Sequence, residues 1–195
     1  MNWFVLAVAA SFVLAMSASA EDKKPEGPVT LKLVAKKDKY TFDGGGKTAE
    51  EYKKDLEAVA AKLAKGEDAR PPKAPTVDLV LQLTNTSKDE VTIYVGGDSN
   101  VYTFELTGGA GVVTMNSGLA FTADFRLPKA VTLTAGTSHE IAVKQLADGS
   151  RGAARYVYWT GPGEYKLAAK YTLSDKDGGK GTELKSEPVK ITVEK

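Results

Sequence analysis

The feature that most restricts how this chain can fold is its division into short apolar or alternating stretches separated by turn residues. Such stretches are typical of β-strands, and only one segment has the 3.6-residue period of a helix. A parallel sheet needs a helix between successive strands, so the pattern predicts an all-β, antiparallel β-sandwich. The spacings between residues 77–83, 91–95 and 101–106 favour hairpins. The predicted strands are residues 29–33, 77–83, 91–95, 101–106, 120–125, 130–134, 139–143, 155–159, 165–173 and 189–193.

The single helical segment has clear signals at both ends. Thr48 followed by Glu51 has the spacing of a capping box, in which the two side chains satisfy free backbone amides of the first turn. Gly66 and the prolines at 71 and 72 end the segment. We therefore expect a helical insertion at about residues 48–65, packed on a sheet. Its apolar face consists of Tyr52, Leu56, Val59, Ala60 and Leu63.

The N-terminus has the pattern of a secretory signal peptide. Residues 3–16 form an apolar run that is followed by Ala18-Ser19-Ala20 and then by charged residues. The run is shorter than the roughly 18 residues of a membrane-spanning helix. We expect cleavage after Ala20, so that residues 1–20 are the signal peptide and residues 21–195 form a single β-sandwich domain. The mature protein is expected to be exported to the periplasm, cell envelope or medium, without stable membrane insertion.

The composition excludes several kinds of site. The chain contains no Cys, which excludes disulfide scaffolds, Cys-ligated zinc and thiol nucleophiles. His139 is the only histidine, so sites with two imidazoles are also excluded, and its place beside a turn predicts a solvated side chain. Lys and Arg number 26 against 25 Asp and Glu, a net charge of +1, so nothing indicates a nucleic-acid partner.

A late strand begins with the sequence Gly163-Glu164-Tyr165. The alternation that follows places Tyr165 and Leu167 on one face, which we interpret as the core face. A Gly-x-Tyr-x-apolar start to a late strand resembles the tyrosine corner of immunoglobulin-like sandwiches. The resemblance implies that the Tyr165 ring is buried and that its hydroxyl bonds to the backbone. The expected fold is thus an immunoglobulin-like antiparallel β-sandwich with one short helical insertion.

A wider resemblance covers residues 77–173. Three motifs in this range resemble those of bacterial intracellular proteinase-inhibitor (BsuPI) domains and their exported immunoglobulin-like relatives. They are a strand that ends in Asn85-Thr86-Ser87, the segment 131–136 that ends in Thr134-Ala135-Gly136, and Pro162-Gly163-Glu164-Tyr165. These are motifs of the fold rather than of an inhibitory site. The signal peptide and the helical insertion depart from that family, as does the lack of an identifiable reactive loop.

Three turns invite a chemical interpretation. Residues 42–48 imitate the end of a phosphate-binding loop but have Thr41 where its first glycine belongs. Residues 175–179 imitate a calcium loop but have Ser186 where its final glutamate belongs. Residues 96–100 contain Asp98 and Asn100, which also suit a tight turn. We interpret all three as plain turns and expect no cofactor, no metal and no catalytic residue, since the chain also lacks a Gly-x-Ser-x-Gly nucleophile motif.

The best candidate for a partner-binding surface is residues 148–159. Alternation places Tyr156 and Tyr158 on the face opposite Val157 and Trp159, so that one aromatic pair faces the core and the other lies nearer solvent. With two arginines, an outward tyrosine pair suits binding to a protein or a sugar ring. The alternative is that these residues pack inside the sandwich. The candidate binding residues are Arg151, Arg155, Tyr156 and Tyr158.

These observations predict that the protein is not an enzyme. We expect an exported, non-catalytic immunoglobulin-like interaction module of the cell envelope whose partner is an unknown protein or a glycan. A secreted protease inhibitor and a carbohydrate-binding module are the two alternatives.

Overall fold

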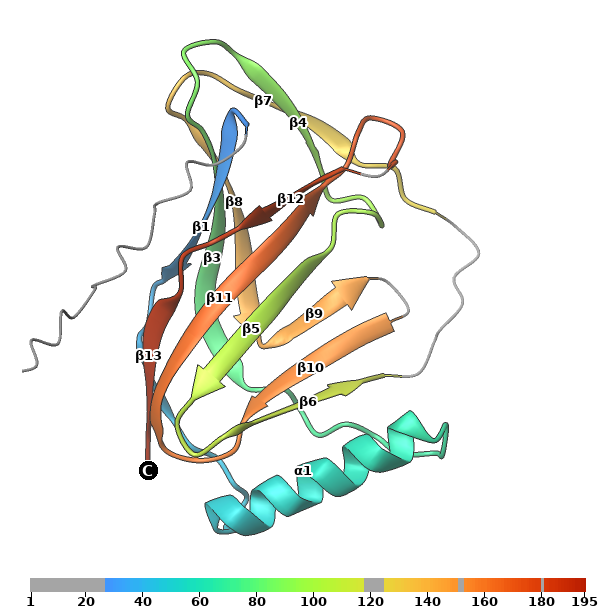
Figure 1. The fold of residues 1–195 in the computed structure, drawn as a ribbon, viewed down its shortest axis with the longest axis vertical. Coiled ribbons are helices and arrows are strands. Elements are labelled where there is room, and N and C mark those ends of the chain that lie inside the picture. The colour runs from blue at the N-terminus through green and yellow to red at the C-terminus, as the bar shows by residue number, and fades with distance from the viewer. Residues whose placement is uncertain (1–26, 118–124, 151–152, 180) are drawn as a thin grey trace, which may run out of the picture.

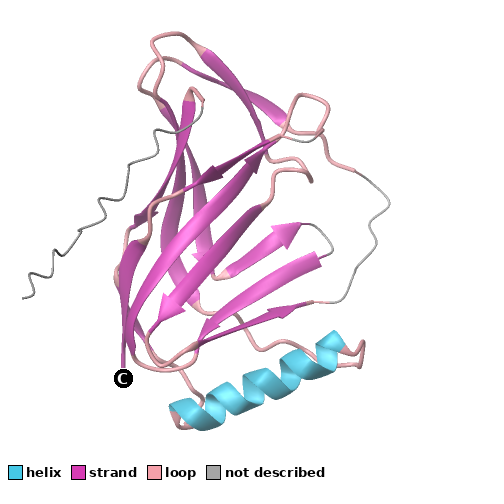
Figure 2. Cartoon of the chain, in the orientation of Figure 1, coloured by secondary structure: helices cyan, strands magenta, loops and turns pink. Residues whose placement is uncertain are grey.

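The computed structural model describes residues 27–117, 125–150, 153–179 and 181–195. Within these ranges the chain forms antiparallel β-sheets that face each other, with a single helix at one end (Figures 1 and 2). The predicted all-β sandwich with one helical insertion is confirmed. The predicted signal peptide and nearly all of the predicted strand at 120–125 lie outside the described residues.

Two sheets make up the body of the sandwich. One has the strand order β1-β3-β8. The other has β11 at its centre, with β12 and β13 along one side of it and β5 along the other, and β2 pairs in parallel with β13. Together these two sheets form a β-sandwich. The bounds are β1 (Val29–Ala35), β2 (Lys39–Thr41), β3 (Thr76–Asn85), β5 (Tyr102–Gly108), β8 (Ser138–Gln145), β11 (Gly163–Leu173), β12 (Thr182–Lys185) and β13 (Val189–Glu194).

Smaller sheets extend this body. One joins β4 (Val91–Val95) to β7 (Lys129–Leu133), and another has the order β6-β10-β9, formed by β6 (Val112–Asn116), β9 (Ala147–Ser150) and β10 (Ala153–Trp159). The sequence pattern did not predict β2, β6, β9 or β12. β2, β9 and β12 have only three or four residues, and β9 contains an Asp-Gly pair that is typical of turns.

The predicted hairpins between β3, β4 and β5 are wrong. β3 pairs with β1 and β8, β4 pairs with β7, and β5 pairs with β11. Asn85 explains the first change of sheet: it is buried, and its side-chain amide donates to the carbonyls of Asp89 (2.8 Å) and Leu133 (2.9 Å). Because the side chain satisfies backbone groups at this bend, the chain crosses to another sheet instead of folding back on β3.

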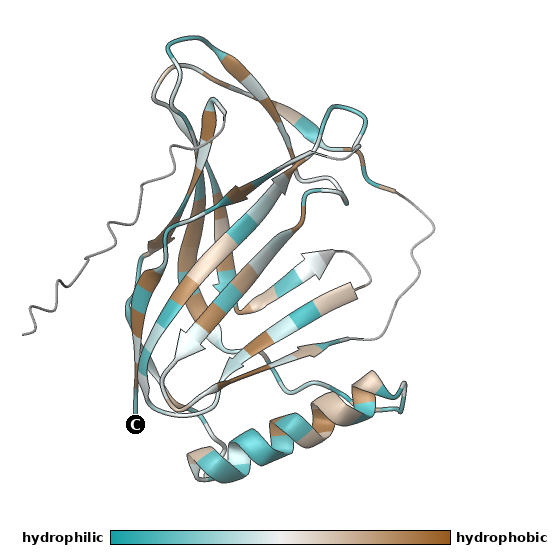
Figure 3. Cartoon of the chain, in the orientation of Figure 1, coloured by the Kyte–Doolittle hydropathy of each residue, from teal (hydrophilic) through white to brown (hydrophobic). Residues whose placement is uncertain are grey.

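Tyr165, near the start of β11, belongs to the main core. Its side chain is fully buried, and its hydroxyl donates to the Gly161 carbonyl (2.7 Å) and accepts from the Ala110 amide (3.2 Å). Burial raises the pKa of Tyr165. The predicted burial and backbone bond of this tyrosine are confirmed. Figure 3 shows hydrophobic positions alternating with hydrophilic ones along the strands, as expected when one face of each strand is buried.

Helix α1 (Ala49–Ala64) has the predicted capping box. The Glu51 amide donates to the Thr48 hydroxyl (3.3 Å), and the Thr48 amide donates to the Glu51 carboxylate (2.9 Å). Gly66 follows the helix with a φ of 74°, which favours glycine. The predicted apolar face packs on β6 and β10, with Leu56 buried in a second cluster that is separate from the main core.

The capping box supplies a first prediction. Thr48→Ala should lower the free energy of unfolding by about 1 kcal/mol, since it removes the oxygen that accepts the Glu51 amide. Urea denaturation measures the change. Thr48→Ser keeps that oxygen and should recover most of the loss, so equal stability of the two variants would contradict the proposed role of the hydroxyl.

Candidate functional site

The structure places Tyr156 and Tyr158 beneath helix α1. Tyr158 is fully buried, and its hydroxyl donates to the Pro72 carbonyl (2.6 Å). Tyr156 is half-buried in the same cluster, while Val157 and Trp159 on the opposite face belong to the main core. The prediction of an outward tyrosine pair is therefore wrong for Tyr158, because α1 adds a layer over the strand face that alternation alone leaves open.

Arg155 forms an ion pair inside the molecule. Its Nε and Nη2 donate to the two carboxylate oxygens of Asp148 at 2.9 and 2.7 Å, and Nη2 also donates to the Phe104 carbonyl (2.5 Å). The same carboxylate accepts the Phe104 amide (2.6 Å). Bonding to Asp148 raises the pKa of Arg155 further. The pair thereby joins the edge of β5 to strands β9 and β10. The role of Arg155 and Tyr156 in binding a partner stays a prediction, and Arg151 lies outside the described residues.

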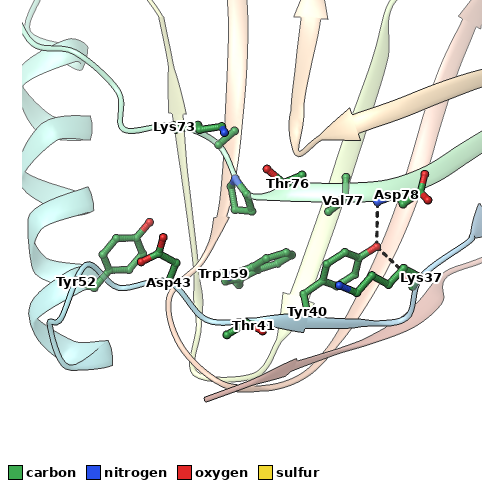
Figure 4. A pocket seen from close by; sticks show the side chains of 12 residues that line it. Lys37, Tyr40, Thr41, Asp43, Tyr52, Lys73, Thr76, Val77, Asp78 and Trp159 are labelled. Atoms are coloured by element: carbon green, nitrogen blue, oxygen red, sulfur yellow. Dashed lines mark hydrogen bonds between the residues drawn. The ribbon is translucent and has the colours of Figure 1, made fainter.

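A pocket of about 440 Å³ opens between α1, β2, the segment that leads into β3, and the end of β10 (Figure 4). Four separate parts of the chain therefore build one hollow against the edge of the sandwich. Its lining residues are Lys37, Tyr40, Thr41, Asp43, Tyr52, Lys73, Ala74, Pro75, Thr76, Val77, Asp78 and Trp159.

Aromatic rings form the inner wall of this pocket. The ring centroids of Tyr40 and Trp159 lie 5.5 Å apart at an angle of 32°. The Tyr40 hydroxyl donates to the Lys37 carbonyl (2.6 Å) and accepts the Asp78 amide (3.2 Å), as the dashed lines in Figure 4 show. Tyr52 comes from the helix and meets Phe42 edge to face, with 5.5 Å between ring centroids. The wall is thus held in place by contacts on several sides.

Charged side chains surround the mouth of the pocket. The Lys37 ammonium lies 5.4 Å from the centroid of the Tyr40 ring. The Asp43 carboxylate accepts the Gly45 amide (3.0 Å), and no ion pair joins Asp43 or Lys73 to any residue within the described ranges. Such ammonium and carboxylate groups are available to bond the polar groups of a ligand.

The shifted pKa values of the pocket residues Asp78, Tyr40 and Tyr52 all lie farther from neutral pH than the ordinary values of these groups. A hydrogen bond from Lys144 lowers the pKa of Asp78. Burial raises the pKa of Tyr40, and burial together with the charge of Asp43 raises the pKa of Tyr52. At neutral pH, Asp78 is therefore ionised and both tyrosines are protonated.

Sequence reasoning missed this pocket because its residues come from distant segments with no shared motif. The only nearby signal was the glycine-rich turn at 42–48, which the structure shows as the connection from β2 to α1. The turn at 175–179 connects β11 to β12 in a hairpin, as predicted, and the Asp175 carboxylate accepts the amides of Asp177 (3.0 Å) and Gly179 (2.7 Å). In the parts of the chain that the structure describes, no cluster of three or more His, Cys, Asp or Glu side chains is placed to bind a metal.

Comparison with protein-family models, curated proteins and solved structures finds no match to this chain. The resemblance to the proteinase-inhibitor domains therefore stays a prediction. Among the described residues, no helix has the length and apolar character needed to cross a membrane.

Proposed function

We propose that this protein is an exported, non-catalytic binding module of the cell envelope and that the pocket between α1 and the sandwich is its ligand site. The observation that carries this proposal is the combination of an aromatic wall, formed by Tyr40, Tyr52 and Trp159, with two charged groups at the mouth. These groups, Asp43 and Lys73, form no ion pair within the described residues. Ligand pockets typically join an apolar lining to a few polar groups that orient the ligand.

The protonation states favour binding over catalysis. A general acid or base works best with a pKa near the working pH. In this pocket the shifts of Tyr40, Tyr52 and Asp78 all move away from that range. His139, the only histidine of the chain, lies on β8 and does not line the pocket.

The lining suits a sugar. Aromatic rings pack against the apolar faces of sugar rings, while ammonium and carboxylate groups bond the hydroxyls. A volume of about 440 Å³ lies in the lower part of the range, roughly 300–1,000 Å³, that is common for small-molecule pockets. We therefore favour a short glycan segment as the ligand, in keeping with the proposed location of the protein in the cell envelope.

Tryptophan fluorescence tests this proposal. The chain contains Trp3 and Trp159 only, and Trp3 lies in the predicted signal peptide, so emission from the mature protein reports on the pocket wall. Titration with envelope glycans should change this emission in a saturable way. If no glycan fragment does so, and none binds on a glycan array, the assignment of a glycan is wrong.

Variants at the mouth should separate binding from stability. Lys73→Ala and Asp43→Ala should each weaken glycan binding roughly tenfold, since each removes a charged hydrogen-bonding group. Both side chains are exposed, so the melting temperature should change little. Lys88→Ala, an exposed lysine outside the pocket, is the matched control. Equal weakening by Lys88→Ala would show that binding depends on overall charge and not on the pocket.

A further inference from the structure

Strand β8 forms one edge of the β1-β3-β8 sheet, and part of its backbone has no partner. The Asn85 amide donates to the Thr137 carbonyl (3.0 Å), so residues 85 and 137 form a hydrogen-bonded pair of the antiparallel ladder. On the other side of β3, the Lys36 amide donates to the Asp78 carbonyl (2.9 Å), so the even residues of β3 bond to β1. The odd residues of β3 and β8 therefore bond to each other.

This alternation directs the amides and carbonyls of Glu140 and Ala142 away from β3, whereas the register shifts at Lys144, between the Leu79–Val143 and Thr76–Gln145 pairs. On this side β8 is the last strand of its sheet, so no strand within the described ranges pairs with the outward groups of Glu140 and Ala142. The side chains of all three residues are exposed on the outer face of the sheet. β8 therefore offers a free row of donors and acceptors that an added strand can bond.

From Ser138 to Val143 the edge lacks the usual protection against pairing, and the register shift of β3 lies beyond this stretch. Edge strands of monomeric proteins are commonly blocked by proline, by a bulge or by repeated lysine. β8 has no proline, and its register with β3 is regular from Ser138 to Val143. Its two outward charges, Glu140 and Lys144, are opposite in sign and stand at equal distances from Ala142 along the strand.

We propose that β8 pairs antiparallel with β8 of a second copy of this chain, with Ala142 on the two-fold axis. In that register Glu140 of each copy lies opposite Lys144 of the other. The Ala142 pair on the axis exchanges two backbone hydrogen bonds, and the Glu140 amide and carbonyl point toward the other copy. On the inner face, Ile141 of each copy lies opposite Val143 of the other, so the apolar side of the sheet continues across the axis.

Charge selects this register. An axis at residue 140 places Glu140 opposite its own copy, and an axis at residue 144 does the same for Lys144. Directly opposed like charges destabilise a strand pair, whereas opposite charges stabilise it. An axis at 141 or 143 leaves both charges without a direct opposite partner. Only the axis at Ala142 satisfies both charges together with the backbone.

The surroundings of β8 leave room for the second copy. An open cavity of about 460 Å³ lies along part of this edge, lined by residues 142–145 of β8 together with Lys73, Thr76, Tyr102 and Ala147. Lys144 already bonds Asp78 of β3 through its Nζ (2.5 Å), and the Gln82 amide lies 3.5 Å from the Glu140 carboxylate. In the dimer, the Lys144 ammonium therefore lies between Asp78 of its own copy and Glu140 of the other.

Sedimentation of the purified protein over a series of concentrations, from low micromolar to submillimolar, tests the proposal. The wild type should pass from monomer to dimer as its concentration rises. Glu140→Lys and Lys144→Glu should each weaken the dimer roughly tenfold or more, since each places like charges opposite one another. The double variant Glu140→Lys/Lys144→Glu should recover the wild-type dimer, because the charges are exchanged and again complementary.

A backbone variant provides an independent measurement. Ala142→Pro removes the amide that is donated across the axis, and no strand within the described ranges pairs with this side of β8. The variant should be monomeric, with a circular dichroism spectrum like that of the wild type. The proposal is overturned if the wild type stays monomeric at every concentration, or if it dimerises and the charge exchange has no effect. A dimer that the double variant does not recover also overturns it.

Discussion

Replacing Arg155 with alanine should lower the free energy of unfolding by about 3 kcal/mol, the low end of the range for one partner of a buried ion pair. The variant leaves the Asp148 carboxylate, whose side chain is fully buried, without its cation. The Phe104 carbonyl at the edge of β5 loses its donor as well. The expected cost lies at the low end of this range because the Arg155 side chain is about 30% exposed.

Urea denaturation of Arg155→Ala measures this cost. Lys190→Ala removes an ion pair with Glu164 in which both side chains are mostly exposed, and it should cost less than about 1 kcal/mol. Arg155→Lys keeps the charge but cannot form the two parallel bonds to Asp148, so it should fall between these variants. If Arg155→Ala were as stable as Lys190→Ala, the pair would not hold β5 against β9 and β10.

Tyr158→Ala should have the largest effect, a loss of about 3–5 kcal/mol, because it empties the space between β10 and helix α1. In a domain of this size, such a loss lowers the melting temperature by roughly 6–20 °C. Tyr158→Phe keeps the ring and removes only the hydroxyl that donates to Pro72, so it should cost about 1 kcal/mol.

Calorimetry, with circular dichroism at the helical wavelengths, distinguishes these variants. Tyr156 lies on the same face but is only half-buried, so Tyr156→Ala should lower the melting temperature less than Tyr158→Ala. A Tyr158→Ala variant that melts with the wild type would contradict the packing of α1 on β10. Neither Tyr156 nor Tyr158 lines the pocket. Glycan binding should therefore depend on Lys73 and Asp43 and not on these two tyrosines.

Local sequence signals predicted the elements that depend on near neighbours. The capping box of Thr48 and Glu51 and the apolar face around Leu56 fixed the start and orientation of α1, because both act within a few residues. The start of β11 likewise predicted the buried Tyr165, whose hydroxyl bonds the Gly161 carbonyl only four residues away. Most long strands were found for the same reason, since alternation is a property of the strand itself.

Tertiary structure decided which surfaces these elements cover. Alternation showed that Tyr156 and Tyr158 share a face, but only the position of α1 shows that this face is covered. The Asp148–Arg155 ion pair joins β9 and β10, and Arg155 also bonds the Phe104 carbonyl of β5. The Asn85 side chain bonds the Leu133 carbonyl where the chain passes from one sheet to another. Such contacts join residues far apart in sequence, so no local pattern encodes them.

The candidate site shows the same division. The pocket residues share no sequence motif, and each one alone has the features of an ordinary surface or core residue. They include Lys37, Tyr40, Tyr52, Lys73 and Trp159. They become a pocket only where α1 and the segment before β3 meet the end of β10. The sequence by itself thus determined the fold class, the helix and the lack of thiol chemistry, because these follow from composition and local periodicity. The place of the binding site was decided by the packing of distant segments, since a hollow is a property of several elements together.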